Sequence, residues 1–147
     1  LFPDSYQLFK GMTLEEILAK MVRRLREVVT QELIDEAQAR GLTLHTLLTL
    51  ASIIEREAVV PSEQPMISAV FWNRMGLNMM LQADPTVQYA LGKGYQSLSR
   101  EDLLTDSPYN TYRYRGLPPT PIANPGKSAS KARALSSSIV REISTGT

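Results

Sequence analysis

Residues 43–58, TLHTLLTLASIIEREA, contain the helix on which the predicted fold depends. At roughly 100° per residue, the apolar side chains of this stretch recur along one arc of a helix. The arc consists of Leu44, Leu47, Leu48, Ala51 and Ile54. Glu55 falls inside the arc, whereas Arg56 projects with the polar side formed by His45, Thr49 and Ser52. The stretch therefore predicts an amphipathic helix that carries one carboxylate on its apolar face.

A carboxylate in this position has two interpretations. Desolvation against aliphatic side chains favours the protonated form, which is the form that a general acid needs near neutral pH. The alternative is a structural glutamate held in a salt bridge, since ion-pair networks also place carboxylates in such surroundings. Glu57 lies at the edge of the apolar arc, and we assign it no chemistry.

The composition excludes several classes of protein. A chain of 147 residues is long enough for one domain with a hydrophobic core. It carries 16 basic and 15 acidic residues, a balance that argues against binding nucleic acid by phosphate neutralisation. No apolar run approaches the roughly 18 residues of a membrane span. With no cysteine and a single histidine, we expect no metal site and no other cofactor.

The rest of the chain predicts a mainly helical α+β fold with short β-strands and a groove lined by the Glu55 helix. Apolar periodicity after the capping box of Thr13 predicts a long helix from Leu14 that stops at Gly41, with a break near Thr30. Further helices are expected over residues 62–74 and 86–91. Alternating side chains over residues 79–83 indicate a short strand.

A long loop is predicted from Asp106 to Gly126, which holds five of the nine prolines. Its tyrosines alternate with arginines and an asparagine, a mixture that suits single-stranded nucleic acid or carbohydrate. The alternative is a proline-stiffened loop held on the domain by its own tyrosines. In either case we expect residues 107–125 to be ordered against the core.

Several short blocks resemble one family. They occur in a fixed order and spacing, as LASIIERE (50–57), VFWNRM (70–75), LQADPTVQY (81–89), SPYNTY (107–112), GLPPTPI (116–122) and NPG (124–126). Together they are similar to the YceG-like family of endolytic murein transglycosylases. The resemblance covers residues 1–135 and makes them a catalytic domain, whereas residues 136–147 depart from the family pattern as a divergent or truncated tail.

The resemblance implies a reaction and a set of site residues. Family members cut the β-1,4 bond between N-acetylmuramic acid and N-acetylglucosamine without water and leave 1,6-anhydro ends. Glu55 matches the catalytic glutamate. The implied substrate-binding residues are Gln82, Asp84, Tyr109, Asn110 and Tyr112. Two of these have local alternatives, Asp84 as a helix N-cap and Asn110 as a turn-former.

The alternatives to this activity are a non-catalytic peptidoglycan-binding domain and a hydrolase of lysozyme type. The family also implies peptidoglycan glycan strands as substrate, peptidoglycan synthases as partners, and no nucleic acid. It implies anchorage in the bacterial cytoplasmic membrane by a segment outside this chain, with the catalytic domain on the extracytoplasmic side. Since the tail lacks the expected terminal strands, we expect this chain alone to cleave weakly or not at all.

Overall fold

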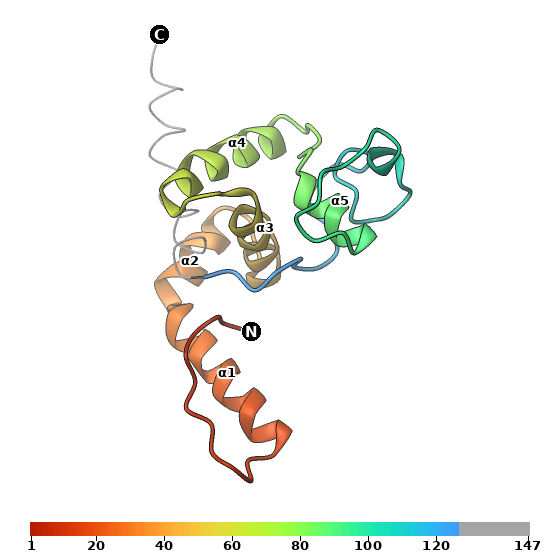
Figure 1. Ribbon diagram of the computed structural model, residues 1–147. Coiled ribbons are helices and arrows are strands. Elements are labelled where there is room, and N and C mark those ends of the chain that lie inside the picture. Colours follow the sequence, from red (N-terminus) through yellow and green to blue (C-terminus); the bar gives the residue numbers. More distant parts are fainter. Residues whose placement is uncertain (127–147) are drawn as a thin grey trace.

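The computed structural model describes residues 1–126, which form helices joined by irregular segments (Figure 1). The α-helices are α1 (Leu14–Val28), α2 (Gln31–Ala39), α3 (Leu44–Glu57), α4 (Gln64–Gly76) and α5 (Asp84–Leu91). Single turns of 3-10 helix occur at η1 (Pro61–Glu63) and η2 (Asp102–Leu104). The tail that was predicted to diverge, residues 136–147, lies outside the described residues.

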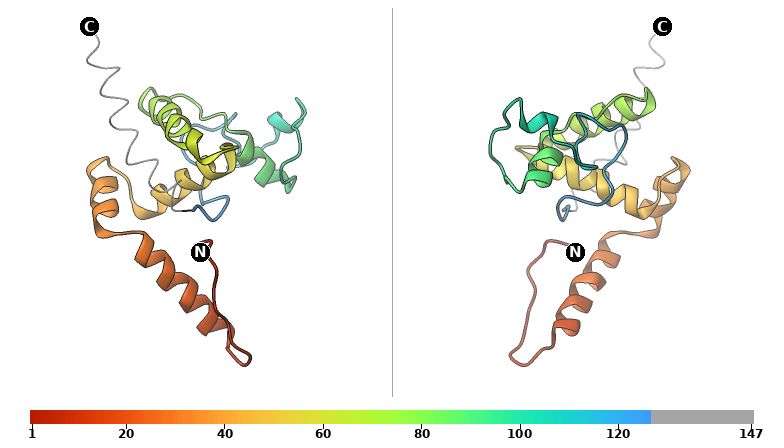
Figure 2. Two further views of the ribbon diagram at one scale, coloured as in Figure 1. Left: turned by 60° about the vertical axis from the view of Figure 1, so that its left-hand side comes forward. Right: turned by 90° about the vertical axis from the view of Figure 1, so that its right-hand side faces the viewer.

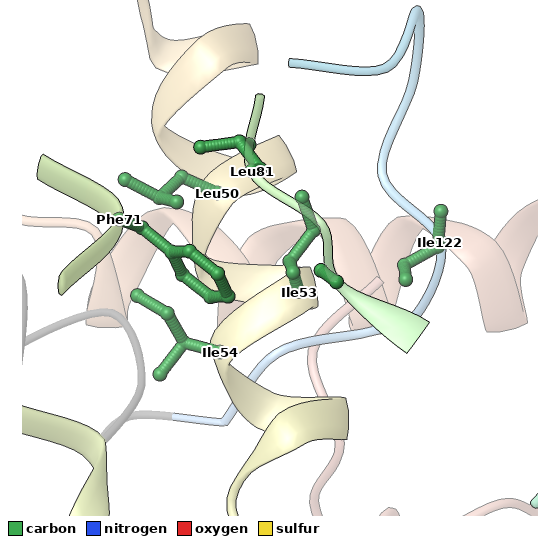
Figure 3. Close-up of a cluster of buried hydrophobic side chains, with 7 residues drawn as sticks. Leu50, Ile53, Ile54, Phe71, Leu81 and Ile122 are labelled. Atoms are coloured by element: carbon green, nitrogen blue, oxygen red, sulfur yellow. The ribbon is translucent and has the colours of Figure 1, made fainter. Parts of the chain in front are cut away.

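Helix α3 is the central element, with α2, α4 and α5 packed around it (Figure 1). It begins where the Thr43 side chain accepts a hydrogen bond from the Thr46 amide. Its Leu50, Ile53 and Ile54 are fully buried and provide one side of the hydrophobic core (Figure 3). The remaining core side chains come from α4, from the segment before α5 and from the final loop: Phe71, Leu81, Ala83 and Ile122.

The side of α3 that the sequence marked as polar is also covered. Thr49 and Ser52 are buried because residues 117–126 cross this face. The Ile122 amide donates to Ser52 Oγ over 3.0 Å, and the His45 ring lies 2.8 Å from the Pro119 carbonyl oxygen. The Ser52 hydroxyl thus serves as a buried acceptor for the loop. The polarity of these side chains therefore does not show which side of α3 faces solvent.

The predicted α+β class is wrong, because residues 1–126 contain no β-strand. The segment 79–83, expected to be a strand, is irregular. Gln82 has a backbone φ of 51°, which interrupts an extended conformation. The amides of Gln82 and Ala83 donate to the carbonyl and hydroxyl oxygens of Thr111, so a loop residue satisfies the groups that a strand ladder would otherwise use.

The other predicted helices are present with adjusted ends. The long N-terminal helix breaks where expected, since α1 ends at Val28 and the Thr30 side chain caps α2. Helix α4 begins at Gln64 after the turn of η1, not at an N-cap of Ser62. Helix α5 begins with Asp84 itself and ends at Leu91, followed by Gly92 as C-cap, whose φ of 66° suits glycine.

The first residues of the chain run back along α1, and the two segments project together from the rest of the structure (Figure 2). Arg24 of α1 forms an ion pair of 2.6 Å with Asp4, and Lys20 donates to the Gln7 carbonyl over 2.7 Å. Helix α1 itself has no buried residue, and Leu14 is 65% exposed. Polar contacts therefore join the two segments of the arm, beside Phe2, which is 6% exposed and lies under the Arg24 guanidinium.

Candidate active site

The C-terminal end of α3 presents three charged side chains in succession, Glu55, Arg56 and Glu57. Since each residue turns the helix by roughly 100°, the three project in different directions. Each consequently meets different neighbours: the start of α4 and Gly126 beside Glu55, the loop after α5 beside Arg56, and a group of polar residues beside Glu57.

Glu55 is partly buried, and neutral donors hold its carboxylate. The backbone amide of Gly126 donates to Oε2 over 3.2 Å, and the side-chain amide of Gln64 donates to the same oxygen over 3.4 Å. A Cβ atom at Gly126 would lie 3.7 Å from both carboxylate oxygens, so the backbone approaches closely there. Within residues 1–126 no arginine or lysine forms an ion pair with Glu55.

Gln64 is the buried polar neighbour of this carboxylate. Its side chain is only 4% exposed, and its Oε1 atom has no hydrogen-bond partner in the described part of the chain. A buried amide oxygen without a partner is costly, so its retention beside a carboxylate is typical of a functional position. No sequence pattern indicated this role, because Gln64 is a single amide at the start of a helix.

A second polar group surrounds Glu57. Partial desolvation raises the pKa of the Glu57 carboxyl, the charge of Asp84 raises it further, and Arg74 opposes both. The side chain as a whole is exposed, and solvent weakens these effects. Raised carboxyl pKa values are common among catalytic acids. Sequence reasoning assigned no chemistry to Glu57, and the only signal was its position two residues after Glu55.

Asp84 and Tyr112 form the centre of this group. The Tyr112 hydroxyl donates to Asp84 Oδ1 over 2.5 Å. Desolvation, followed by the bond to Asp84 and the nearby negative charges, raises the pKa of Tyr112 to about 12. Asp84 makes no side-chain capping bond to α5, so the N-cap alternative is wrong. Gln82 is exposed two residues away.

The other two predicted substrate residues have structural contacts. Asn110 is fully buried; its amide donates to the Leu103 and Thr105 carbonyls and its oxygen accepts from the Tyr112 amide. These bonds fit the turn-forming alternative. Tyr109 packs at 5.0 Å against the ring of Tyr89 and its hydroxyl lies 2.8 Å from Thr120 Oγ1.

The predicted site residues therefore fall into separate groups. Asp84 and Tyr112 are hydrogen-bonded to each other. The charge of Asp84 raises the pKa of Glu57, and the charge of Glu57 raises the pKa of Tyr112. The hydrogen bonds of Glu55 are made with Gln64 and Gly126, not with any of the five residues predicted to bind substrate. The structure thus places two carboxylates with distinct surroundings at one helix end.

Fold and site together define a class of helical domain in which a central helix carries, near its C-terminal end, a partly buried glutamate that accepts hydrogen bonds from neutral donors. The chain belongs to the YceG-like family, which it matches over residues 1–137. It is 42% identical over 133 residues to an endolytic murein transglycosylase of Bacillus subtilis, covering 90% of this chain and 37% of that protein. A Streptococcus pneumoniae protein of the same name is 33% identical and is covered over 24% of its length.

The fold agrees with a solved structure. A crystal structure of a yceG-like protein from Listeria monocytogenes superposes with a TM-score of 0.79 at 42% sequence identity. The match covers 87% of this chain and 42% of that one. The chain thus spans less than half the length of each of these relatives.

Proposed function

We propose that this chain is the catalytic part of an endolytic peptidoglycan lytic transglycosylase. It would cleave the β-1,4 bond between N-acetylmuramic acid and N-acetylglucosamine within glycan strands. Support comes from membership of the YceG-like family and from relatives that are named endolytic murein transglycosylases. The observation in this structure that carries the proposal is that, among residues 1–126, only neutral donors hold the Glu55 carboxylate.

Glu55 has the surroundings that a proton-transferring carboxylate requires. An ion-paired glutamate is held ionised by its cation, whereas Glu55 accepts only neutral hydrogen bonds among residues 1–126. This favours catalysis over the structural salt bridge that the sequence left open. Gln64 and Gly126 orient the carboxylate without supplying a charge, an arrangement suited to a general acid–base residue.

The proposed reaction needs one carboxylate acting twice. Glu55 first protonates the glycosidic oxygen as the bond to the muramyl anomeric carbon breaks. It then accepts the proton of the muramyl 6-hydroxyl, whose oxygen bonds to that anomeric carbon and closes the 1,6-anhydro ring. The nucleophile is tethered to the substrate, so no second carboxylate is needed to activate water.

We assign substrate contacts to the exposed polar group around Glu57. Gln82, Asp84 and Tyr112 offer an amide, a carboxylate and a hydroxyl to the sugar hydroxyls and N-acetyl groups. Tyr109 and Asn110 act one step away, by shaping the loop that carries Tyr112. This division follows from the burial of Asn110 and the exposure of Gln82.

We further propose that the chain works on the extracytoplasmic side of a bacterial cytoplasmic membrane, beside peptidoglycan synthases. The support is chemical, because polymerised peptidoglycan lies on that side and is made by these enzymes. Among residues 1–126 no helix is long and apolar enough to cross a bilayer. Both the membrane anchor and the synthase partner are thus part of this proposal.

Mass spectrometry of the products released from purified sacculi tests the activity. A transglycosylase yields internal fragments ending in 1,6-anhydro-muramic acid. A lysozyme-type hydrolase yields reducing muramic acid ends, and a binding domain yields no fragments while still sedimenting with the sacculi. When the assay uses a chain that extends through the family's C-terminal strands, the proposal predicts the first result, and either of the others contradicts it.

A further inference from the structure

A cavity on the Arg56 side of α3 is not used by the proposed chemistry. Its volume is about 270 Å³, and its wall includes Arg56, the residue that follows Glu55 on α3. The wall consists of Arg56, Ile122 and residues of α5 and the turn that follows it, Pro85, Gln88, Tyr89, Gly92 and Gly94. Arg56 lies between Glu55 and Glu57 in the sequence and projects from α3 at roughly 100° to each, so the cavity begins one residue away from both glutamates.

The Arg56 guanidinium is oriented but has hydrogen-bonding capacity left. Its centre lies 3.8 Å from the centroid of the Tyr95 ring, and Nη2 donates to the Gly94 carbonyl over 3.1 Å. Within residues 1–126 no carboxylate forms an ion pair with it. An arginine carries five N–H donors in a planar fork that matches a carboxylate, so several donors remain available.

Exposed aromatic surface surrounds this guanidinium. Tyr95 is 79% exposed although Arg56 orients its ring, and Tyr89 is 47% exposed at the cavity wall. Rings held in place but left in solvent provide flat contact area at a small entropy cost. A guanidinium is also more weakly hydrated than an ammonium group, which favours its use in binding carboxylates.

From these features we infer that the cavity is a subsite for a carboxylate of the short peptides attached to muramic acid. This inference rests on the proposed function, since it assumes a peptidoglycan strand at Glu55. Arg56 would bind the carboxylate in a bidentate manner, while Tyr89 and Tyr95 contact the peptide chain. The cavity is smaller than a typical complete ligand site, as expected for one branch of a larger substrate.

The first experiment compares two substrates that differ only in the peptides. Cleavage of peptide-bearing glycan strands is measured beside the same strands after an amidase has removed their peptides. The intact protein should show a kcat/KM about tenfold higher on the peptide-bearing strands, and Arg56→Gln should lose this preference. Arg100→Gln, which removes an exposed arginine elsewhere, is the matched control and should keep it.

A purely structural role for Arg56, as a tether for the loop at Gly94, gives a different pattern. It lowers cleavage of both substrates by the same factor, and that result overturns the inference. An unchanged preference in Arg56→Gln overturns it as well. Circular dichroism and unfolding midpoints of both arginine variants establish that they are folded.

A binding experiment separates this inference from the proposed activity. In a Glu55→Gln background, calorimetry measures the affinity for disaccharide-peptides whose carboxylates are free or amidated. We expect about tenfold tighter binding of the free acid, and loss of that difference when Arg56→Gln is added. If this holds while the wild type cleaves nothing, the activity fails and the subsite stands. If the wild type cleaves glycan strands but Glu55→Gln binds the free and amidated ligands equally well, the proposed activity stands and the subsite is refuted.

Discussion

At the scale of single residues, the two glutamates at the end of α3 differ in what holds them. Glu55 is fixed by neutral donors from Gly126 and Gln64. Glu57 lies in the field of Asp84 and Arg74, and its pKa is raised. A raised pKa is common at catalytic acids but also arises in polar clusters, so the electrostatics of Glu57 alone do not make it the acid.

Gln64 should position Glu55, and its loss should affect the rate more than binding. We predict that Gln64→Met, which keeps the length of the side chain, lowers kcat on glycan strands by about tenfold. The reason is that Glu55 loses a donor that orients its carboxylate. Steady-state kinetics measure the split between kcat and KM. Gln38→Met on exposed α2 is the control, and an unchanged kcat in Gln64→Met would contradict this positioning role.

Tyr112 should titrate at an unusually high pH. Desolvation, followed by the hydrogen bond to Asp84, raises its pKa in the folded protein from the usual 10.0 to about 12. The contribution of this group to stability is therefore complete below pH 10.0 and is lost as pH rises through about 12.

Nuclear magnetic resonance of tyrosine rings labelled with carbon-13 can follow this titration. In Asp84→Asn the Tyr112 signal should titrate at a lower pH, because the negative partner is gone. Tyr6, which donates to a backbone carbonyl instead, is an internal reference within each sample. An unshifted Tyr112 titration in the variant would show that Asp84 does not govern this group.

At the scale of elements, sequence periodicity predicts the helices well and the irregular segments poorly. The helix carrying Glu55 and the break before Thr30 follow from local spacing and capping. The supposed strand over residues 79–83 does not, because its conformation depends on Thr111, 28 residues beyond Ala83. Contacts of this kind are set by tertiary packing, and no local pattern contains them.

The link between Thr111 and the start of α5 should be a major source of stability. Thr111 Oγ1 accepts from the Ala83 amide over 3.0 Å and lies 2.8 Å from Thr86 Oγ1, all in buried positions. Thr111→Val keeps the shape but leaves the buried Ala83 amide without its acceptor, while the Thr86 hydroxyl still donates to the Ala83 carbonyl. We predict a loss of about 1–3 kcal/mol in the free energy of unfolding.

Urea denaturation measures this loss. Thr105→Val is the matched control, since the Thr105 hydroxyl makes no hydrogen bond among residues 1–126 and should change stability little. If both variants unfold at the same urea concentration, the Thr111 link is not stabilising. A large effect confined to Thr111→Val supports the view that this loop positions α5 and Asp84.

The candidate site shows the same division between local and tertiary information. Glu55 could be found from one helix, because a carboxylate on an apolar arc is a local anomaly. Gln64, Arg56 and Gly126 could not, since their roles depend on three segments that meet only after folding. Asn110 was open to two interpretations in the sequence, and its buried hydrogen bonds favour the structural one.

At the scale of the whole molecule, the structure combines a packed body with a projecting arm. The body contains the cluster around Leu50, Ile53 and Ile54. The arm consists of α1 and the segment that runs along it (Figure 2).

We predict that the arm opens independently of the body. Helix α1 has no buried residue, whereas seven residues of α3 are buried. Native-state hydrogen exchange should therefore show α1 amides exchanging through local opening, while α3 amides exchange only near the free energy of global unfolding. Equal protection of the two helices would contradict the low local stability assigned to α1.

The rate of glycan cleavage by Glu55→Gln, measured beside Glu57→Gln, tests the central claim most directly. Glutamine keeps the shape of either side chain but cannot transfer the proton. We predict that Glu55→Gln remains folded and loses about 10²–10⁴-fold in rate, the usual contribution of general acid–base catalysis, while Glu57→Gln loses far less. Near wild-type cleavage by folded Glu55→Gln, or the larger loss in Glu57→Gln, would contradict the assignment of Glu55 as the acid and base.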